Sequence, residues 1–232
     1  MLKKHPIIFI IFLLLTSGCD FTSAGEYYNQ ALELEKKGKF EDAILKLDRA
    51  IEKQPKFRAA LLNRGVYKSE LSKYTDANND YKKILEFDSD NTYALYNIGL
   101  NHQRLKNYKK SIPYFDEALK TEGALNAFGL ITNNDFKKFD SDADYNMFES
   151  EIYYQRGVGF LEMKDFDNSI SDFQTALKLN YSEANCFYLI GEAYLGKKDS
   201  LNACQNFIKS AKLGDLDARE MIKEHCLRNK KK

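Results

Sequence analysis

The sequence predicts an all-α protein built as a solenoid of helical hairpins, and three observations lead to this fold class. The 232 residues include only 3 prolines and 12 glycines, too few for the many tight turns of an all-β sandwich. Apolar residues recur at the i, i+3/i+4 and i+7 spacing that gives a helix one buried face. Columns of similar residues also return along the chain at an interval of 34 residues.

The composition fits one large domain or two small ones, with no nucleic-acid partner. At 44% hydrophobic and 30% charged residues, the chain has enough apolar side chains to fill a core. Lys and Arg together number 35 against 34 Asp and Glu, so the chain lacks the basic excess that binds a phosphate backbone. We therefore expect no nucleic-acid binding.

Residues 1–18 have the features of a secretory signal peptide. Lys3 and Lys4 precede the apolar run from Ile7 to Leu15, which is far shorter than the roughly 20 residues that span a bilayer. Small residues then lead into Cys19, in the order Thr16-Ser17-Gly18-Cys19. This predicts cleavage and export to the cell envelope.

The residues in front of Cys19 resemble the lipobox of bacterial lipoproteins, although Thr16 stands where Leu is usual. The resemblance implies lipidation of Cys19, which would anchor the mature protein to a membrane facing the periplasm or the exterior. Residues 19–23 would be a short linker, about 17 Å long when extended. Two alternatives remain at this point: cleavage that leaves Cys19 unmodified, or an uncleaved anchor.

Four columns of residues keep the same register through the rest of the chain. Two are small and two are bulky, and their successive gaps are 34, 34, 58 and 34 residues. The long gap implies one insertion of 58 − 34 = 24 residues, at 126–149. The small columns are Ala31, Gly65, Gly99, Gly157, Gly191 and Ala43, Ala77, Ser111, Ser169, Ala203; the bulky ones are Leu47, Tyr81, Phe115, Phe173, Phe207 and Tyr27, Leu61, Leu95, Tyr153, Phe187.

This pattern of small and bulky residues resembles the tetratricopeptide repeat. The five units would be 24–57, 58–91 and 92–125, then 150–183 and 184–217 after the insertion. The resemblance implies a right-handed superhelical solenoid of five hairpins, and residues 218–232 would supply a capping helix and a basic tail. The signature Trp of the family is missing, since the chain contains none.

Little in the sequence points to catalysis, a cofactor or a metal. There is no glycine-rich phosphate loop, serine elbow or HExxH motif, so we expect no enzyme. His102 and His225 sit at helix-packing spacings. Asp140, Asp142 and Asp144 echo a calcium loop with Glu151, but Tyr145 stands where the sharp turn needs Gly, so no metal is expected. Instead, Asp140 or Ser141 is expected to cap the next helix.

Three cysteines remain after Cys19. With a turn near Asp215, Cys204 and Cys226 lie eleven residues before and after it, where antiparallel helices place side chains next to each other. This predicts a Cys204–Cys226 disulfide in an oxidising compartment and leaves Cys186 as a packed free thiol. The alternative is that all three are small core residues.

The family binds ligands in the groove lined by the first helix of each unit, which implies two groove columns here. One lies immediately after the packed column, about 100° around the helix, and the other one turn later. The alternative is that these residues only pack neighbouring helices. The groove residues would be Tyr28, Leu62, Tyr96, Tyr154 and Tyr188, with Leu32, Val66, Leu100 and Val158 one turn further.

Together these features predict a membrane-anchored scaffold that binds a segment of an unidentified protein partner in the groove. The family's carboxylate clamp needs Lys and Asn in the two columns and finds neither, so a chaperone-type acidic C-terminus is not the expected ligand. An alternative function is a solute- or glycan-binding lipoprotein of an uptake system.

Overall fold

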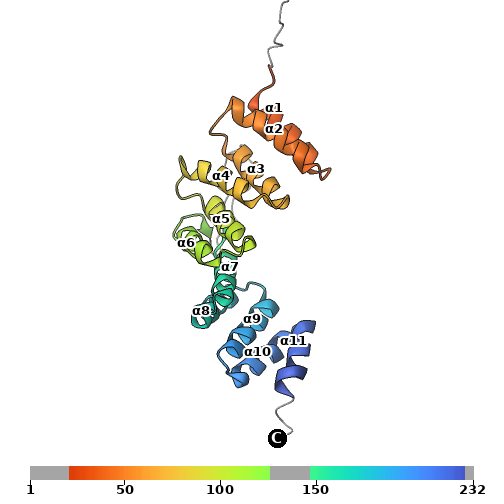
Figure 1. Cartoon of the computed structure of the whole chain (residues 1–232), viewed down its shortest axis with the longest axis vertical. Coiled ribbons are helices and arrows are strands. Elements are labelled where there is room, and N and C mark those ends of the chain that lie inside the picture. Colours follow the sequence, from red (N-terminus) through yellow and green to blue (C-terminus); the bar gives the residue numbers. More distant parts are fainter. Residues whose placement is uncertain (1–20, 126–146, 228–232) are drawn as a thin grey trace, which may run out of the picture.

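The computed structural model describes residues 21–125 and 147–227, which form antiparallel helical pairs stacked along one axis (Figure 1). The signal peptide with Cys19, residues 126–146 and the basic tail from 228 lie outside the described residues. The pairs are α1 Ala24–Glu35 with α2 Phe40–Lys53, α3 Arg58–Glu70 with α4 Tyr74–Leu85, α5 Thr92–Arg104 with α6 Tyr108–Ala118, α7 Glu149–Glu162 with α8 Phe166–Lys178, and α9 Glu183–Gly196 with α10 Ser200–Lys212.

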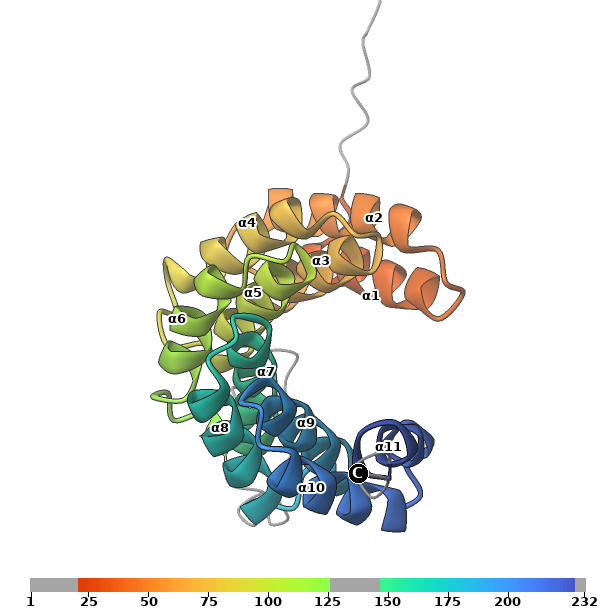
Figure 2. The ribbon, with the colours of Figure 1, turned by 60° about the horizontal axis from the view of Figure 1, so that its bottom comes forward.

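The stack curves into an arc, as expected for a right-handed superhelical solenoid. Figure 2 shows α1, α3, α5, α7 and α9 on the inner side of the arc, and their partner helices on the outer side. The inner helices therefore share one continuous face.

Among residues 21–125 and 147–227, no helix combines the length and the apolar character needed to cross a bilayer.

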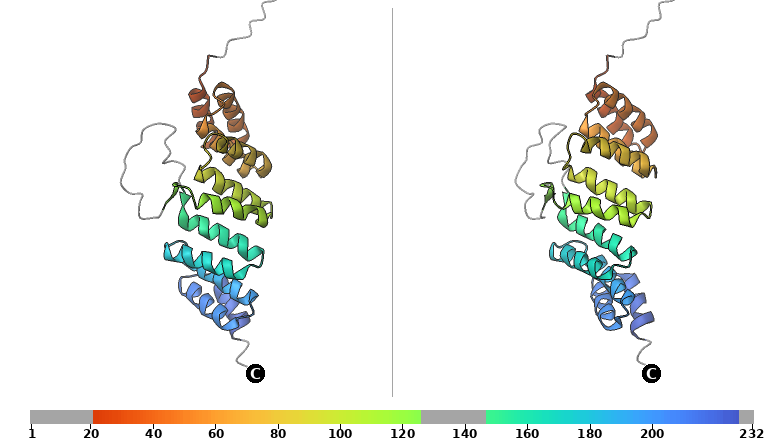
Figure 3. Two further views of the ribbon diagram at one scale, coloured as in Figure 1. Left: turned by 90° about the vertical axis from the view of Figure 1, so that its left-hand side faces the viewer. Right: turned by 60° about the vertical axis from the view of Figure 1, so that its left-hand side comes forward.

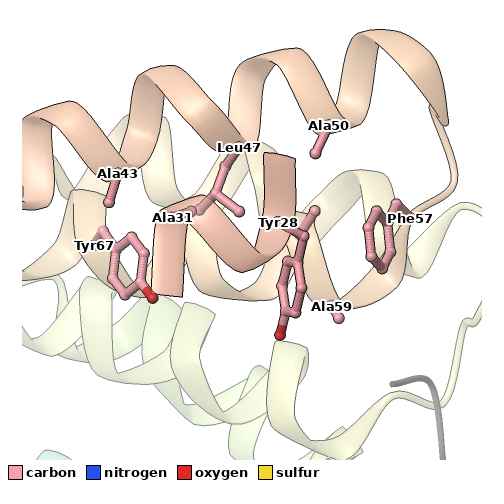
Figure 4. Packing of buried hydrophobic residues seen from close by; sticks show 9 residues of the cluster. Tyr28, Ala31, Ala43, Leu47, Ala50, Phe57, Ala59 and Tyr67 are labelled. Atoms are coloured by element: carbon pink, nitrogen blue, oxygen red, sulfur yellow. The ribbon is translucent and has the colours of Figure 1, made fainter. Parts of the chain in front are cut away.

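Inside each hairpin, a small residue on the first helix contacts a bulky one on the second, as predicted. A Cβ atom added to Gly65 would lie 2.6 Å from the Tyr81 ring, and one added to Gly99 would lie 2.7 Å from the Phe115 ring. In the first unit the same two positions are Ala31 and Leu47, both fully buried in the cluster shown in Figure 4. Because Leu47 is smaller than the aromatic rings of the later units, it leaves room for the methyl group of Ala31.

Polar side chains fix several helix starts. Ser23 and Glu26 form a capping box at the start of α1, and the Asn91 side chain accepts a hydrogen bond from Ala94 N at 2.8 Å in α5. Asp165 and Asp199 cap α8 and α10 in the same way. These caps satisfy backbone N–H groups that a helix start leaves without partners.

The two ends of the insertion meet in a short parallel pair of strands, β1 Ala124–Leu125 and β2 Met147–Phe148. Figure 3 shows this pair at the edge of the stack. The next helix begins at Glu149 with Phe148 at its N-cap, so the prediction that Asp140 or Ser141 caps it is wrong. Pairing with β1 holds Met147 and Phe148 extended, which delays the helix. Asp140, Asp142 and Asp144 lie outside the described residues.

The two ends of the array are closed differently. In the second unit, Ala60, Arg64 and Tyr67 are buried against the preceding unit. The first unit has no described unit before it, and the same positions hold the exposed polar residues Glu26, Gln30 and Glu33. At the C-terminal end, α11 Leu216–Met221 and a single π-helical turn, Ile222–Cys226, pack on α10. Polar residues thus close one end of the array and an extra helix covers the other.

Candidate functional site: the inner face of the array

Three of the predicted groove residues lie in the core. The exposed fractions of Tyr28, Leu62 and Tyr96 are 8%, 1% and 4%. A residue 100° around the helix from the packed column points toward the next unit as well as toward the inner side, so these side chains pack between units. The alternative reading of this column, as helix packing, therefore applies to these three positions.

Tyr96 shows how this column joins adjacent units. Its ring centre lies 5.9 Å from that of Phe115 in its own hairpin, and its hydroxyl donates a hydrogen bond to Glu151 Oε1 on α7 at 2.7 Å. Burial, and then the Glu151 carboxylate, raise the pKa of the Tyr96 hydroxyl. Because α7 follows the insertion, this bond connects the units on its two sides.

The C-terminal members of the column are half-buried. The Tyr154 ring lies 5.7 Å from Phe173 and 5.3 Å from Tyr181, and the Tyr188 ring lies 5.7 Å from Phe207. Burial raises the pKa of Tyr188 to about 12, with Glu192 as a second cause. These tyrosines thus remain neutral and partly accessible.

The second predicted column is less buried than the first, and its members pack at the edge of the core clusters. Its four aliphatic members are half-buried and sit about 140° around the helix from the packed column. We call Leu32, Val66, Leu100 and Val158 the aliphatic column. It runs through α1, α3, α5 and α7, which form the inner side of the arc in Figure 2.

A column of amide side chains lies three residues before the aliphatic one, and sequence reasoning missed it. Its members sit about 200° from the packed column, opposite the partner helix. The sequence did contain a signal for this column, because these residues are separated by the same 34, 34 and 58 residues as the packed column. We call Asn29, Asn63, Asn97 and Gln155 the amide column; Asn29 is exposed and the others are half-buried.

A buried charge network between the first two units was also missed. Arg64 donates to both carboxylate oxygens of Asp80, Nε to Oδ2 at 2.9 Å and Nη2 to Oδ1 at 2.5 Å. Its Nη1 donates to Asp48 of the preceding unit at 2.7 Å, and Lys68 donates to Asp80 at 2.7 Å. Burial lowers the pKa of Arg64, but the two carboxylates outweigh it and raise the pKa overall.

A similar network recurs after the insertion, with Phe160 in place of the lysine. Arg156 donates to Asp172 at 2.8 and 2.7 Å and to Asp116 at 2.7 Å. Asp48, Arg64 and Asp80 are spaced by 16 residues, as are Arg156 and Asp172, and the 40 residues from Asp116 to Arg156 are 16 plus the 24 inserted. This matched spacing is the sequence signal that could have revealed both networks.

The structure joins Cys204 to Cys226 in a disulfide, with the two Cα atoms 5.8 Å apart. Cys186 is a buried free thiol whose Sγ–H donates to the Tyr181 carbonyl at 3.3 Å, and burial raises its pKa to about 12. Cys204 lies at the same position in its unit as Asn78, whose side chain accepts from Asn101 of the following unit at 2.9 Å. The disulfide thus takes the place of a contact between units.

His102 and His225 both lie on helices. His102 stacks on Tyr114 with ring centres 5.5 Å apart, and burial, then Lys110 and Lys82, lower its pKa. His225 belongs to the π-helical turn, with Nε2 3.9 Å from the Glu224 carboxylate. His102 is therefore neutral at neutral pH and acts as a flat packing group.

Comparison with known families matches the chain to the tetratricopeptide repeat at residues 28–68, and again at 92–124 and 150–183. A DnaJ protein P58IPK homolog from Arabidopsis thaliana is 24% identical over 179 residues. That match takes in 67% of this chain but only 37% of the relative's length.

Solved structures share the fold. The segment of MamA from Desulfovibrio magneticus RS-1 that starts at its residue 41 superposes with a TM-score of 0.68 at 19% identity, covering 82% of this chain and 94% of that one. YrrB, described as a TPR protein with an unusual peptide-binding site, gives a TM-score of 0.67 at 20% identity, covering 87% and 92%. At these identities, the likeness concerns the fold.

Proposed function

Because the chain is a tetratricopeptide repeat protein, we propose that it is a scaffold of the bacterial cell envelope, anchored through a lipid on Cys19. Tetratricopeptide repeat proteins bind protein partners and are generally not enzymes. In our proposal, the partner contributes a segment that lies along the inner face of the arc.

The observation that carries this proposal is the aliphatic column. Leu32, Val66, Leu100 and Val158 are half-buried apolar side chains that recur on four successive inner helices. An apolar strip flanked by polar residues suits a peptide segment, which can bury its own apolar side chains there. YrrB, which shares this fold, is described as having a peptide-binding site, which supports the proposal. Nothing in the comparisons favours a solute- or glycan-binding lipoprotein.

The anchor is argued from the residues around Cys19. Lys3, Lys4, the apolar run and the small residues before Cys19 support lipidation, and several acyl chains hold a protein stably on a membrane. Because α1 begins at Ala24, the linker is only five residues long. The first unit would therefore lie close to the membrane surface.

Partner capture tests the inner face. The Val66→Ser/Leu100→Ser variant is expected to lose the crosslinked partner that the wild type captures in the membrane fraction, as identified by mass spectrometry. Leu45 is 63% exposed on the outer helix α2, so Leu45→Ser is a matched control that should keep the partner. Capture that survives the double substitution, in a variant with a wild-type circular dichroism spectrum, would count against the inner face.

Lipidation is tested separately. Wild-type protein should incorporate labelled palmitate and sediment with membranes, and Cys19→Ser should do neither. Cys186→Ser serves as a control for labelling of another thiol and should behave as wild type. The lipid anchor would be rejected if the Cys19→Ser protein still sedimented with membranes and the wild-type protein incorporated no labelled palmitate.

A further inference from the structure

The turn between α5 and α6 carries exposed cations that the proposed function does not use. Residues 104–110 read Arg-Leu-Lys-Asn-Tyr-Lys-Lys, which places four cations and no carboxylate within seven residues. Arg104, Lys106, Lys109 and Lys110 are all exposed. We call these four residues the basic turn.

The other four hairpin turns carry the opposite charge where the second helix begins. Each has a carboxylate at the N-cap or in the first turn of that helix: Glu41 and Asp42, Asp76, Asp165 and Asp167, and Asp199. In α6, Lys109 and Lys110 take the positions of Glu41 and Asp42. The helix dipole disfavours cations at the N-terminus of a helix, so the stability of α6 does not account for them.

Side chains of the second unit extend the basic turn across a junction. The Arg104 guanidinium lies over the Tyr74 ring at 5.7 Å. Burial lowers the pKa of His102, and Lys110 and then Lys82 lower it further, so both lysines lie near this imidazole. Since Lys82 is exposed on α4, the positive surface spans the second and third units.

Within the described part of the chain, no carboxylate forms an ion pair with the basic turn. The buried ion pairs use other cations, namely Arg64, Lys68 and Arg156. Two acids border the surface: Asp76, which holds the position of Lys110 one unit earlier, and Glu162, beside the Tyr108 hydroxyl. The positive charge is therefore left for a ligand.

We propose that the basic turn is a docking surface for an acidic segment of a partner protein, separate from the inner face. Charge complementarity carries the proposal, because grouped cations attract and orient a partner that carries several carboxylates. Arg104 ends α5 while Lys109 and Lys110 begin α6, so the cations are spread around a turn. That arrangement suits a segment with several charges better than one small anion.

Topology favours a protein over a lipid surface. The linker from Cys19 reaches α1 at its start, whereas the hairpin turns follow the ends of the first helices. The 12 residues of α1 separate these two edges by about 18 Å. If the proposed anchor holds, the basic turn also lies two units further along the array, away from the membrane.

The test measures how the purified full-length protein binds a fluorescent polyglutamate peptide, with His102 as an internal reporter. Bound carboxylates should offset the effect of Lys110 and Lys82, so the pKa of His102, followed by NMR, should rise. The pKa of His225, at the C-terminal end, should not change. Binding should weaken as the salt concentration is raised.

One variant separates a docking role from a structural one. Lys109→Glu/Lys110→Asp installs the residues that the first unit has at these positions. It should weaken peptide binding about tenfold or more and slightly raise the melting temperature, since acids are favoured at a helix start. Lys37→Glu/Lys39→Glu makes the same change in net charge at the first turn and should bind as wild type.

Other outcomes would overturn the proposal. Equal weakening by both variants would show a general attraction between charges. A His102 shift as large with phosphatidylglycerol vesicles, or with inorganic phosphate, would assign the surface to a lipid or a small anion. Val66→Ser/Leu100→Ser should leave peptide binding unchanged, and a loss there would place the peptide on the inner face. Failure of the inner-face proposal, by contrast, would not affect this one.

Discussion

The junction between the first and second units and the junction between the second and third use the same positions of the repeat but differ in chemistry. At the first, Arg64 of α3 lies between Asp48 and Asp80, with Lys68 beside Asp80. At the second, each of these positions changes: an aliphatic and two aromatic side chains replace the more buried charges, and an exposed Lys82 stands in place of Asp48. Ile98, Lys82, Tyr114 and His102 stand where the first junction has Arg64, Asp48, Asp80 and Lys68.

This difference shows that the fold constrains the shape of the junction and leaves its chemistry open. Ile98 is fully buried, and His102 stacks on Tyr114 where Lys68 pairs with Asp80. A buried ion network is stable only when all its members are present, whereas an apolar junction tolerates single changes better. The two junctions should therefore respond differently to mutation.

The largest effect is expected at the charged junction. Arg64→Met leaves the Asp80 carboxylate buried without its main partner and should cost about 3–5 kcal/mol in the free energy of unfolding, measured by urea denaturation. Ile98→Val, the matched change at the apolar junction, should cost only about 1 kcal/mol.

A sharper test replaces the four residues of the first junction with those of the second. The combination Asp48→Lys, Arg64→Ile, Lys68→His and Asp80→Tyr removes every member of the network together. It should lose less than half of what Arg64→Met loses, because no charge remains buried alone. A combination that loses more than the single change would contradict the view that the two junctions are interchangeable.

The junction with the C-terminal helix is covalent, and its loss should be the next largest effect. Cys204→Ser/Cys226→Ser removes a cross-link between residues 22 apart, worth about 3 kcal/mol on the loop-entropy model. Faster hydrogen exchange should be confined to α11 and the end of α10. Alkylation before reduction should leave both cysteines unlabelled in exported protein, and label on both would refute the bridge.

A smaller effect is expected within a hairpin, where all units use the same packing. Gly99→Ala would put a methyl group 2.7 Å from the Phe115 ring and should cost about 1–3 kcal/mol. Phe115→Leu should relieve part of that strain, since Ala31 already packs with Leu47 in the first unit. Thermal unfolding of the two single variants and the double variant measures this coupling. Strictly additive losses would argue against direct contact.

The smallest effect concerns Glu192 in the fifth unit, which stands at the position where the first four units have a member of the aliphatic column. Burial, opposed by the Tyr188 hydrogen bond and aided by Glu162, raises the pKa of Glu192. An acid whose pKa is raised on folding costs stability once pH exceeds its unfolded value near 4.5, and this cost is absent at lower pH. Glu192→Gln should thus raise the melting temperature slightly at pH 7 and not at pH 3.5. Equal shifts at both pH values would exclude ionisation as the cause.

Much of the fold was predictable because helical hairpins repeat locally. Gly65, Gly99 and Gly191 keep the register of their aromatic partners, so both the pairing and the 24-residue insertion could be inferred from spacing. The face of each inner helix was harder to assign. Tyr96 was expected in the groove, yet it lies between units and bonds to Glu151, because the twist from unit to unit turns that position toward its neighbour.

The sequence by itself determined the hairpins, since helix periodicity and the fit of small against bulky residues act within about 34 residues of chain. Only the tertiary structure decided which side chains of the inner helices face the inner surface and which pack between units, as Tyr96 does against Glu151. Those choices depend on the angle between neighbouring units. That angle results from packing many side chains together, so no single column of residues encodes it.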